Sequence, residues 1–291
     1  MNLEAIQAEL RARGLAAWLF YDHHRRDPIA YRILGLLGGL PETAMATRRW
    51  YYLIPAAGAP RKLAHRIESG MLETLPGEGR LYAERGELEA GLRQLLAGLG
   101  PAPLPAPLVA MQYSPDCALP PISLADAGTV EKVRSLGCAV VSSGDLITRF
   151  DALWSEAMLA SHRVAGRVVD AAIAAAFQCV RDRLNSGPPL SERQLQLWLV
   201  ERMRAGGLQV DEAPIVAVNA HAGDPHYLPP ASGSAPIQAG DLLLLDVWAK
   251  TEGPESAFYD VTWMGYCLRQ GETAPPAEFE DTFALVREAR A

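Results

Sequence analysis

The chain reads Leu-Leu-Leu-Leu-Asp-Val-Trp at residues 242–248 and Phe-Tyr-Asp-Val-Thr-Trp at residues 258–263, and these two segments decide its fold. The four leucines predict a strand that is buried on both faces. The turn-rich stretch between the segments predicts a hairpin about Gly253, with Asp246 and Asp260 directly opposite each other and Cβ atoms roughly 4.5–5.5 Å apart. Two carboxylates at that distance repel unless one is protonated or a cation lies between them. The pair therefore points to a metal site.

From these residues alone, metal binding stands beside a plainer alternative, in which backbone donors or an arginine satisfy each carboxylate. Hard oxygen ligands favour Mg, Mn, Ca or a mixed site over a metal selected by thiolates. A candidate partner is His226, which lies in a loop after the apolar strand predicted at 215–218, twenty residues before Asp246. A solvent-facing or turn-stabilising ring is the alternative for this histidine.

Composition narrows the class of protein. The 291 residues suffice for two domains, and the net charge of −7 gives no basic surface for nucleic acid. Four scattered cysteines without a C-x-x-C pair argue against a zinc ribbon and a disulfide framework. An acidic N-terminus and the lack of any apolar run of ~20 residues predict a cytoplasmic protein that does not enter a membrane. No G-x-S-x-G, G-x-x-x-x-G-K-[ST], G-x-G-x-x-G or H-E-x-x-H motif occurs, which disfavours serine hydrolases, nucleotide-driven enzymes and zincins.

Hydrophobic periodicity divides the chain in two. Residues 1–148 alternate predicted helices (2–13, 86–98, 128–136) with predicted strands (15–21, 49–55, 61–65, 108–113, 139–142), which is typical of an α/β domain. Residues 149–291 are predicted to form an α+β domain. Alanine-rich helix, broken near Asp151, is predicted from about 145 to 185 and leads into this domain. A capping box, Ser191 to Gln194, opens the next helix.

Three motifs occur in an order that resembles the pita-bread metallopeptidases: Pro-His-Tyr at 225–227, Gly-Asp-Leu-Leu-Leu-Leu-Asp at 240–246 and Tyr-Asp-Val-Thr at 259–262. That family includes Xaa-Pro dipeptidase (prolidase), aminopeptidase P and methionine aminopeptidase, with creatinase as a relative that uses no metal. The leading half is similar to the domain that precedes the catalytic one in prolidase and aminopeptidase P. The resemblance implies a creatinase/prolidase-like N-terminal domain at 1–148. It also implies the first half of a pita-bread catalytic domain at 149–291.

The resemblance also implies a role for each candidate residue. Asp246 would hold one ion of a dinuclear site, Asp260 would bridge both ions, and His226 would contact substrate and help stabilise the tetrahedral intermediate. Two divalent ions, Mn by analogy with the relatives and Zn or Co as alternatives, would activate water and polarise the scissile carbonyl. The expected partners are a peptide cleaved before its proline, which the resemblance implies, and a second copy of the chain in a homodimer.

The chain departs from the family in one important respect. The family's remaining ligands, a histidine and two glutamates, come later in the sequence, and the helix predicted at 277–290 ends the chain. Its Glu278, Glu280 and Glu288 are expected on a solvated face. We therefore expect an incomplete, C-terminally truncated pita-bread domain and an inactive fragment. The alternatives are a non-catalytic binding or oligomerisation module on this scaffold and a creatinase-like amidinohydrolase.

Overall fold

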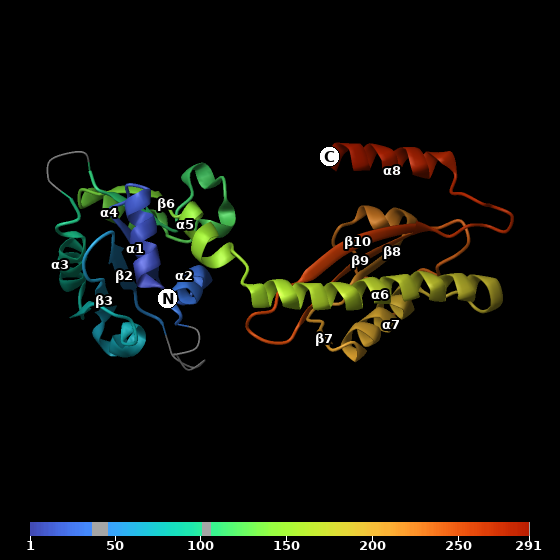
Figure 1. Ribbon diagram of the computed structural model, residues 1–291, viewed down its shortest axis with the longest axis horizontal. Helices are drawn as coiled ribbons and strands as arrows, with labels where there is room; N and C mark the ends of the chain where they lie inside the picture. Colours follow the sequence, from blue (N-terminus) through green and yellow to red (C-terminus); the bar gives the residue numbers. More distant parts are fainter. Residues whose placement is uncertain (37–45, 101–105, 291) are drawn as a thin grey trace. The chain divides into compact units, whose positions relative to one another are not determined.

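The structure is a computed structural model that describes residues 1–36, 46–100 and 106–290. The chain forms two compact units, Met1–Leu153 and Trp154–Ala291 (Figure 1), each with its own hydrophobic core. Within the described ranges, no helix is both long enough and apolar enough to cross a membrane.

The first unit is built on a six-stranded sheet. Its strands are β1 (Ala17–Asp22), β2 (Trp50–Pro55), β3 (Arg61–His65), β4 (Glu78–Tyr82), β5 (Leu108–Met111) and β6 (Ala139–Ser142). The spatial order is β4-β3-β2-β1-β5-β6. β2 runs antiparallel to both of its neighbours, and the other pairs are parallel. The predicted strands are all present, but β4 was not predicted, because four of its five residues are exposed and it lacks an apolar alternation.

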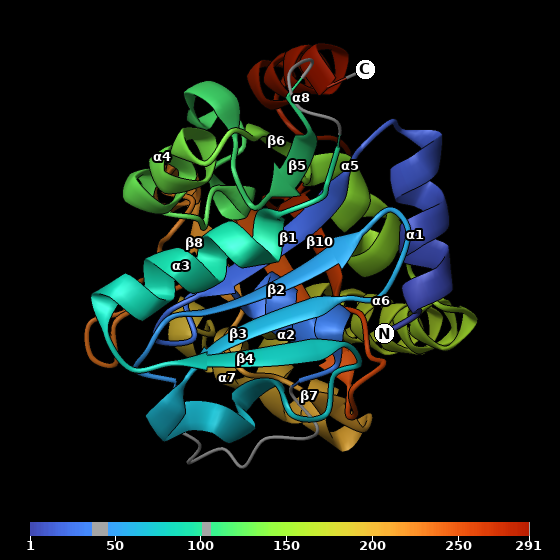
Figure 2. The same cartoon turned by 90° about the vertical axis from the view of Figure 1, so that its left-hand side faces the viewer.

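Helices cover both faces of this sheet. The helices are α1 (Leu3–Ala12), α2 (Pro28–Leu34), α3 (Arg85–Leu96), α4 (Ala127–Ser135) and the short α5 (Gly144–Ile147). α1 and α2 share a core with Trp18 and Trp50, whereas α3, which crosses the sheet in Figure 2, shares the opposite core with α4, Leu19 and Tyr51. Turns of 3-10 helix lie at Arg66–Leu72, Pro115–Cys117 and Pro120–Ile122, and a π-helical turn at Thr148–Ala152 ends the unit. The break expected near Asp151 falls at this π-helical turn.

The second unit places two helices on one face of a smaller sheet. Its elements are α6 (Glu156–Ser186), α7 (Glu192–Ala205), β7 (Leu208–Gln209), β8 (Ile215–Val218), a 3-10 turn (Asn219–Gly223), β9 (Leu242–Thr251), β10 (Tyr259–Tyr266) and α8 (Ala277–Arg290). β9 is central: it pairs with β10 along one side and with β8 and β7 along the other. α6 lies so close to β10 that a Cβ on Gly265 would come within 2.5 Å of the Phe177 ring.

The predicted hairpin forms, but its predicted register is wrong. Asp246 pairs with Thr262, and Asp260 pairs with Trp248, so the two aspartates are diagonal rather than directly opposite. The prediction placed the centre of the hairpin at Gly253. In the structure the paired residues are centred one residue after Gly253, because the loop at 252–258 extends mostly to its C-terminal side. Because side chains alternate between faces, the resulting two-residue slip keeps both aspartates on the same face of the sheet.

The expectation that the leucine-rich strand is buried on both faces is also wrong. Burial along β9 alternates strictly: Leu243, Leu245, Val247 and Ala249 are buried against α6 and α7, and the residues between them are only partly buried. Asp246 is on the partly buried face. Its ionised form therefore keeps some contact with solvent, which removes much of the cost expected for a carboxylate in a dry core.

Candidate metal centre and its supporting loop

Asp246 is held at the centre of the sheet of the second unit. It lies between Ile215 on β8 and Thr262 on β10. The Thr262 hydroxyl donates a hydrogen bond of 2.6 Å to the Asp246 Oδ1 atom. One carboxylate oxygen thus has a fixed donor, which orients the side chain and leaves Oδ2 available for another partner.

Asp260 lies on the same face of the sheet as Asp246, one diagonal step away, and is exposed. Partial burial raises its pKa above the usual value for an aspartate, and the negative charge of Asp246 raises it further. The two carboxylates therefore interact although they do not face each other directly. A divalent cation between them would remove the repulsion, and oxygen donors of this kind suit hard ions such as Mg²⁺ and Mn²⁺.

In the described part of the chain, the two carboxylates are not joined by a third candidate metal ligand. Over 1–36, 46–100 and 106–290, no group of three or more His, Cys, Asp or Glu side chains is placed to hold a metal ion. Glu278, Glu280 and Glu288 are exposed on α8, as expected for a solvated face. The chemistry of the pair fits a divalent metal, but two carboxylates are fewer ligands than such an ion takes.

The structure does not join His226 to the aspartates. His226 is exposed in the loop that follows the 3-10 turn, where its backbone N–H donates to Asp224 Oδ1 at 2.9 Å. No hydrogen bond or ion pair among the described residues links its ring to Asp246 or Asp260. The predicted role of His226 in contacting substrate therefore stays a prediction.

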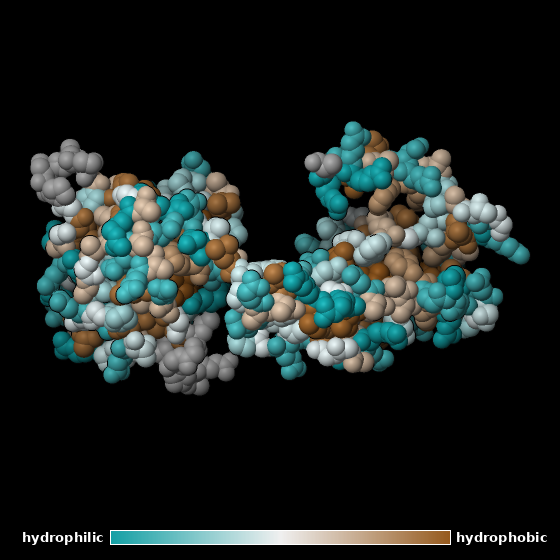
Figure 3. All heavy atoms as spheres, viewed as in Figure 1, coloured by the Kyte–Doolittle hydropathy of each residue, from teal (hydrophilic) through white to brown (hydrophobic). Residues whose placement is uncertain are grey.

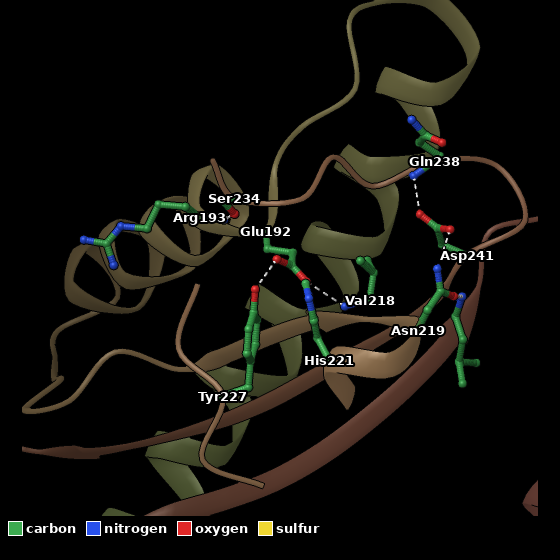
Figure 4. Close-up of polar contacts among 10 residues, drawn as sticks. Glu192, Arg193, Val218, Asn219, His221, Tyr227, Ser234, Gln238 and Asp241 are labelled. Carbon is green, nitrogen blue, oxygen red and sulfur yellow. Dashed lines mark hydrogen bonds and ion pairs between the residues drawn. The ribbon is translucent and has the colours of Figure 1, made fainter. Parts of the chain in front are cut away.

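A buried carboxylate, Glu192, anchors the same loop from the start of α7. Its side chain is fully buried and accepts three hydrogen bonds, shown in Figure 4. Oε1 accepts from the Val218 backbone N–H at 2.9 Å and lies 2.8 Å from His221 Nδ1, and Oε2 accepts from the Tyr227 hydroxyl at 2.7 Å. Three donors compensate for the lost hydration of this carboxylate, so Glu192 connects α7, the end of β8 and the loop.

The two rings held by Glu192 flank His226 in sequence. His221 and Tyr227 stack with centroids 4.4 Å apart. Burial, together with the hydrogen bond to Glu192 and its charge, raises the pKa of Tyr227 to about 12. Tyr227 therefore stays protonated at neutral pH and remains a donor. This arrangement fixes the backbone on both sides of His226 while its own ring stays exposed.

A second polar cluster connects this loop to the first residue of β9 (Figure 4). Asn219 adopts a left-handed backbone conformation, with φ of 50°. Its side chain donates to Asp241 Oδ1 at 2.7 Å and accepts from the Leu242 backbone N–H at 2.9 Å. Asp241 in turn accepts from the Gln238 N–H. The strand that carries Asp246 thus starts from a fixed position.

Several of these residues were not singled out from the sequence. The capping box that opens α7 was predicted and is confirmed: Ser191 accepts from the Gln194 N–H, and Gln194 accepts from the Ser191 N–H. Glu192, however, looks like any acidic residue in a first helical turn, a common position for a solvated side chain. It is buried by a segment that lies some thirty residues later in the sequence and packs against it, so no local sequence pattern predicts its burial.

Comparison with known proteins supports the metallopeptidase resemblance. Residues 160–291 match metallopeptidase family M24. No curated protein matches the chain. Among solved structures, the chain is similar to dipeptidase PepE from Mycobacterium ulcerans, with 19% identity, a TM-score of 0.59, and coverage of 97% of this chain and 67% of that one.

Two further structures are similar. A prolidase from Thermococcus sibiricus has 18% identity, a TM-score of 0.56, and coverage of 99% of this chain and 69% of that one. An X-prolyl aminopeptidase from Caenorhabditis elegans, described as a cytosolic enzyme with a di-nuclear active site, has 18% identity and a TM-score of 0.55 over 95% of this chain and 42% of that one. At these identities the likeness establishes a shared fold, and this chain spans only part of each relative.

Proposed function

We propose that this chain, whose residues 160–291 match metallopeptidase family M24, contributes to a metal-dependent peptidase that cleaves the bond before proline. The observation that carries the proposal is the diagonal placement of Asp246 and Asp260 on one face of the β9–β10 hairpin, where their charges interact. The similar structures include a prolidase and an X-prolyl aminopeptidase, which supports an Xaa-Pro peptide as substrate class.

In the proposed site, Asp246 and Asp260 would hold two divalent ions, with manganese as the first candidate and zinc or cobalt as alternatives. Such ions, when bound, supply Lewis-acid activation of water and of the scissile carbonyl. Thr262 orients Asp246 through its hydroxyl. His226, exposed on a loop whose neighbours are fixed by Glu192, is the proposed contact to the substrate.

We further propose that the 291-residue chain by itself has no peptidase activity and that its second unit is an incomplete pita-bread domain. Two carboxylates supply fewer ligands than a tightly bound divalent ion takes. Titration of the chain with Mn²⁺ in a calorimeter should therefore show weak binding, and submicromolar affinity would contradict this proposal.

The activity itself is tested on the longest polypeptide in which this chain occurs. Hydrolysis of an Xaa-Pro dipeptide and of a longer Xaa-Pro peptide is measured with Mn²⁺ and with EDTA, for wild type, Asp246→Asn and Asp260→Asn. Asp281→Asn, an exposed residue of α8, is the matched control. We expect Mn²⁺-dependent cleavage that both site variants abolish and the control preserves. A rate that EDTA leaves unchanged would overturn the proposal.

One observation favours a second candidate function, a non-catalytic binding or oligomerisation module on the same scaffold. Among the residues that the structure describes, no group of three or more possible metal ligands comes together, and α8 has no buried residue although it carries apolar side chains. If the activity assay fails for every polypeptide that contains this chain, while the chain self-associates, the module is the better description.

A further inference from the structure

A cavity in the first unit lies between α3, α4 and the carboxyl end of β1. Its volume is about 640 Å³, within the range of roughly 300–1,000 Å³ that is typical of small-molecule sites. Tyr21 and Tyr51, cross-strand partners on β1 and β2 with ring centroids 5.1 Å apart, form an aromatic wall. Leu88 and Leu92 of α3 add apolar surface. All of its lining residues belong to the first unit, whereas Asp246 and Asp260 belong to the second.

The position of this cavity follows from the topology of the sheet. β1 is followed by α2, which packs on one face, and the chain then moves to β2 on one side of β1. β5 runs parallel to β1 and lies on the other side of it from β2. Along the chain, β5 is followed by α4, on the opposite face of the sheet from α2, and then by β6, which lies beyond β5. Strand order therefore reverses between β1 and β5. In open α/β sheets, ligands bind outside the carboxyl ends of the strands at such a switch point.

The lining of the cavity is cationic in a chain whose net charge is −7. Four basic side chains, Arg26, Arg49, Arg85 and Lys132, and two acidic ones contribute a net charge of +2. His23, which also lines the cavity, adds no charge at neutral pH, because burial and the neighbouring His24 lower its pKa. A local positive potential on an acidic protein attracts anions selectively.

Internal contacts already satisfy both acidic residues of the lining. Glu89 lies 3.2 Å from Arg85 Nε and 3.4 Å from Lys132 Nζ, which connects α3 to α4. Asp126 accepts hydrogen bonds from the backbone N–H and the hydroxyl of Thr129, at 2.9 and 2.8 Å. These contacts hold the walls of the cavity together and leave the excess positive charge on the remaining two arginines.

Arg26 and Arg49 supply that excess charge. Within the described residues, neither guanidinium makes a hydrogen bond or an ion pair, and both line the cavity. A guanidinium presents two parallel N–H donors that match a phosphate or carboxylate. We propose that this cavity binds a small organic dianion of the phosphate-monoester class, with its phosphate on Arg26 and Arg49 and its apolar or aromatic part against Tyr21 and Tyr51.

The proposal is tested by calorimetric titration of the whole 291-residue chain with phenyl phosphate as the probe. Inorganic phosphate and phenol test the two halves of the probe separately, and benzoate tests a carboxylate in place of the phosphate. Arg49→Ala and Arg26→Ala remove the proposed contacts. Arg93→Ala is the matched control, because it removes the same charge from an exposed position on α3 outside the cavity.

We expect saturable binding of phenyl phosphate that Arg49→Ala and Arg26→Ala each weaken by about tenfold. Arg93→Ala should change the affinity by less than about twofold, since it acts only through the general charge. Phosphate and phenol alone should bind more weakly than the probe. The absence of saturable binding, or equal losses in all three arginine variants, would overturn the site. Equal affinity for benzoate would overturn the assignment to phosphate monoesters.

Circular dichroism on each variant separates loss of binding from loss of folding. Neither arginine side chain makes a hydrogen bond to a described residue, so both variants should fold like wild type. Arg49→Lys, which keeps the charge but removes the two-donor fork, gives a second readout. It should recover part of the affinity lost in Arg49→Ala. Full recovery would show that charge alone holds the ligand and would contradict the two-donor contact.

Discussion

Asp260, a proposed metal ligand, is expected to lower the stability of the folded chain when no metal is bound. Its pKa is raised by burial and by Asp246, so the ionised form costs the folded state free energy. This free-energy cost is absent when the pH is below about 4, the pKa of an aspartate in the unfolded chain. It is fully present when the pH is above the raised pKa of the folded chain. Asp260→Asn should therefore stabilise the metal-free chain at pH 7 by less than about 1 kcal/mol, since the group is largely exposed, and should leave stability at pH 3 unchanged.

Urea unfolding in EDTA at both pH values measures this effect, with Asp281→Asn as the exposed control. The same substitution should abolish the weak Mn²⁺ binding of the chain. A variant that is less stable than wild type at pH 7 would show that Asp260 has a favourable partner in the fold and is not held there for a cation.

Glu192 is the residue on which the loop around His226 depends most. Replacing it with alanine leaves the Val218 N–H, the Tyr227 hydroxyl and His221 without their acceptor. We expect Glu192→Ala to destabilise the second unit by about 3 kcal/mol, because a buried acceptor of several hydrogen bonds is lost. Glu192→Gln, which keeps an acceptor oxygen, should cost less.

Hydrogen exchange over residues 215–227 provides the local measurement for Glu192. Protection of the Val218 amide should fall in Glu192→Ala, and the pKa of Tyr227 should decrease from about 12 in Glu192→Gln, since the negative charge of Glu192 no longer raises it. Glu201→Ala, exposed on the same helix, is the control. Unchanged protection in Glu192→Ala would mean that the loop is held by other contacts.

At the scale of single elements, the first turn of α2 carries an unusual N-cap. Asp27 is buried and accepts from the Ala30 N–H at 2.9 Å. Burial, with a contribution from the charge of Asp22, raises its pKa to about 7. Because the folded pKa lies above the unfolded one, the stability of the first unit should fall as pH rises from about 4 to 7.

Asp27→Asn preserves the cap without the charge, since asparagine is as good an N-cap as aspartate. It should stabilise the first unit by on the order of 1 kcal/mol at pH 8, with a smaller gain at pH 5. Asp126→Asn at the N-cap of α4 is an opposite control. Burial alone would raise the pKa of Asp126, but hydrogen bonds from Tyr21 and Thr129 lower it. Asp126→Asn should therefore lose stability at pH 8. A gain in both variants would contradict the assigned charge states.

The elements also show what a sequence can and cannot specify. The strands at 215–218 and 242–248 and the capping box at Ser191 were predicted because their signals are local: apolar runs and a reciprocal side-chain pattern. The register of the hairpin was not, because it depends on how the loop at 252–258 folds. α2 was missed because it is short and its helical signal is limited to the cap at Asp27 and the proline that follows.

At the scale of the whole molecule, the site could be predicted only in part. Asp246 and Asp260 were found because acidic residues stand out in apolar strands, and the order of motifs indicated the family. Glu192, His221 and Tyr227 were not found, because residues distant in sequence create their environment. The cationic cavity of the first unit was missed for the same reason: its arginines come from three separate segments of the chain.

The exposed apolar residues of the second unit lead to a final prediction, that the chain self-associates. Trp263 of β10 and Phe283, Leu285 and Val286 of α8 are 52–66% exposed, and Figure 3 shows apolar side chains on the surface of this unit. Exposed apolar surface of this kind commonly marks an interface or an aggregation site.

The weight-average mass in sedimentation experiments should therefore rise with protein concentration. Phe283→Glu should reduce the association, whereas Ile67→Glu, at a still more exposed position in the first unit, should not. A chain that stays monomeric at every concentration would contradict both this prediction and the homodimer expected from the sequence.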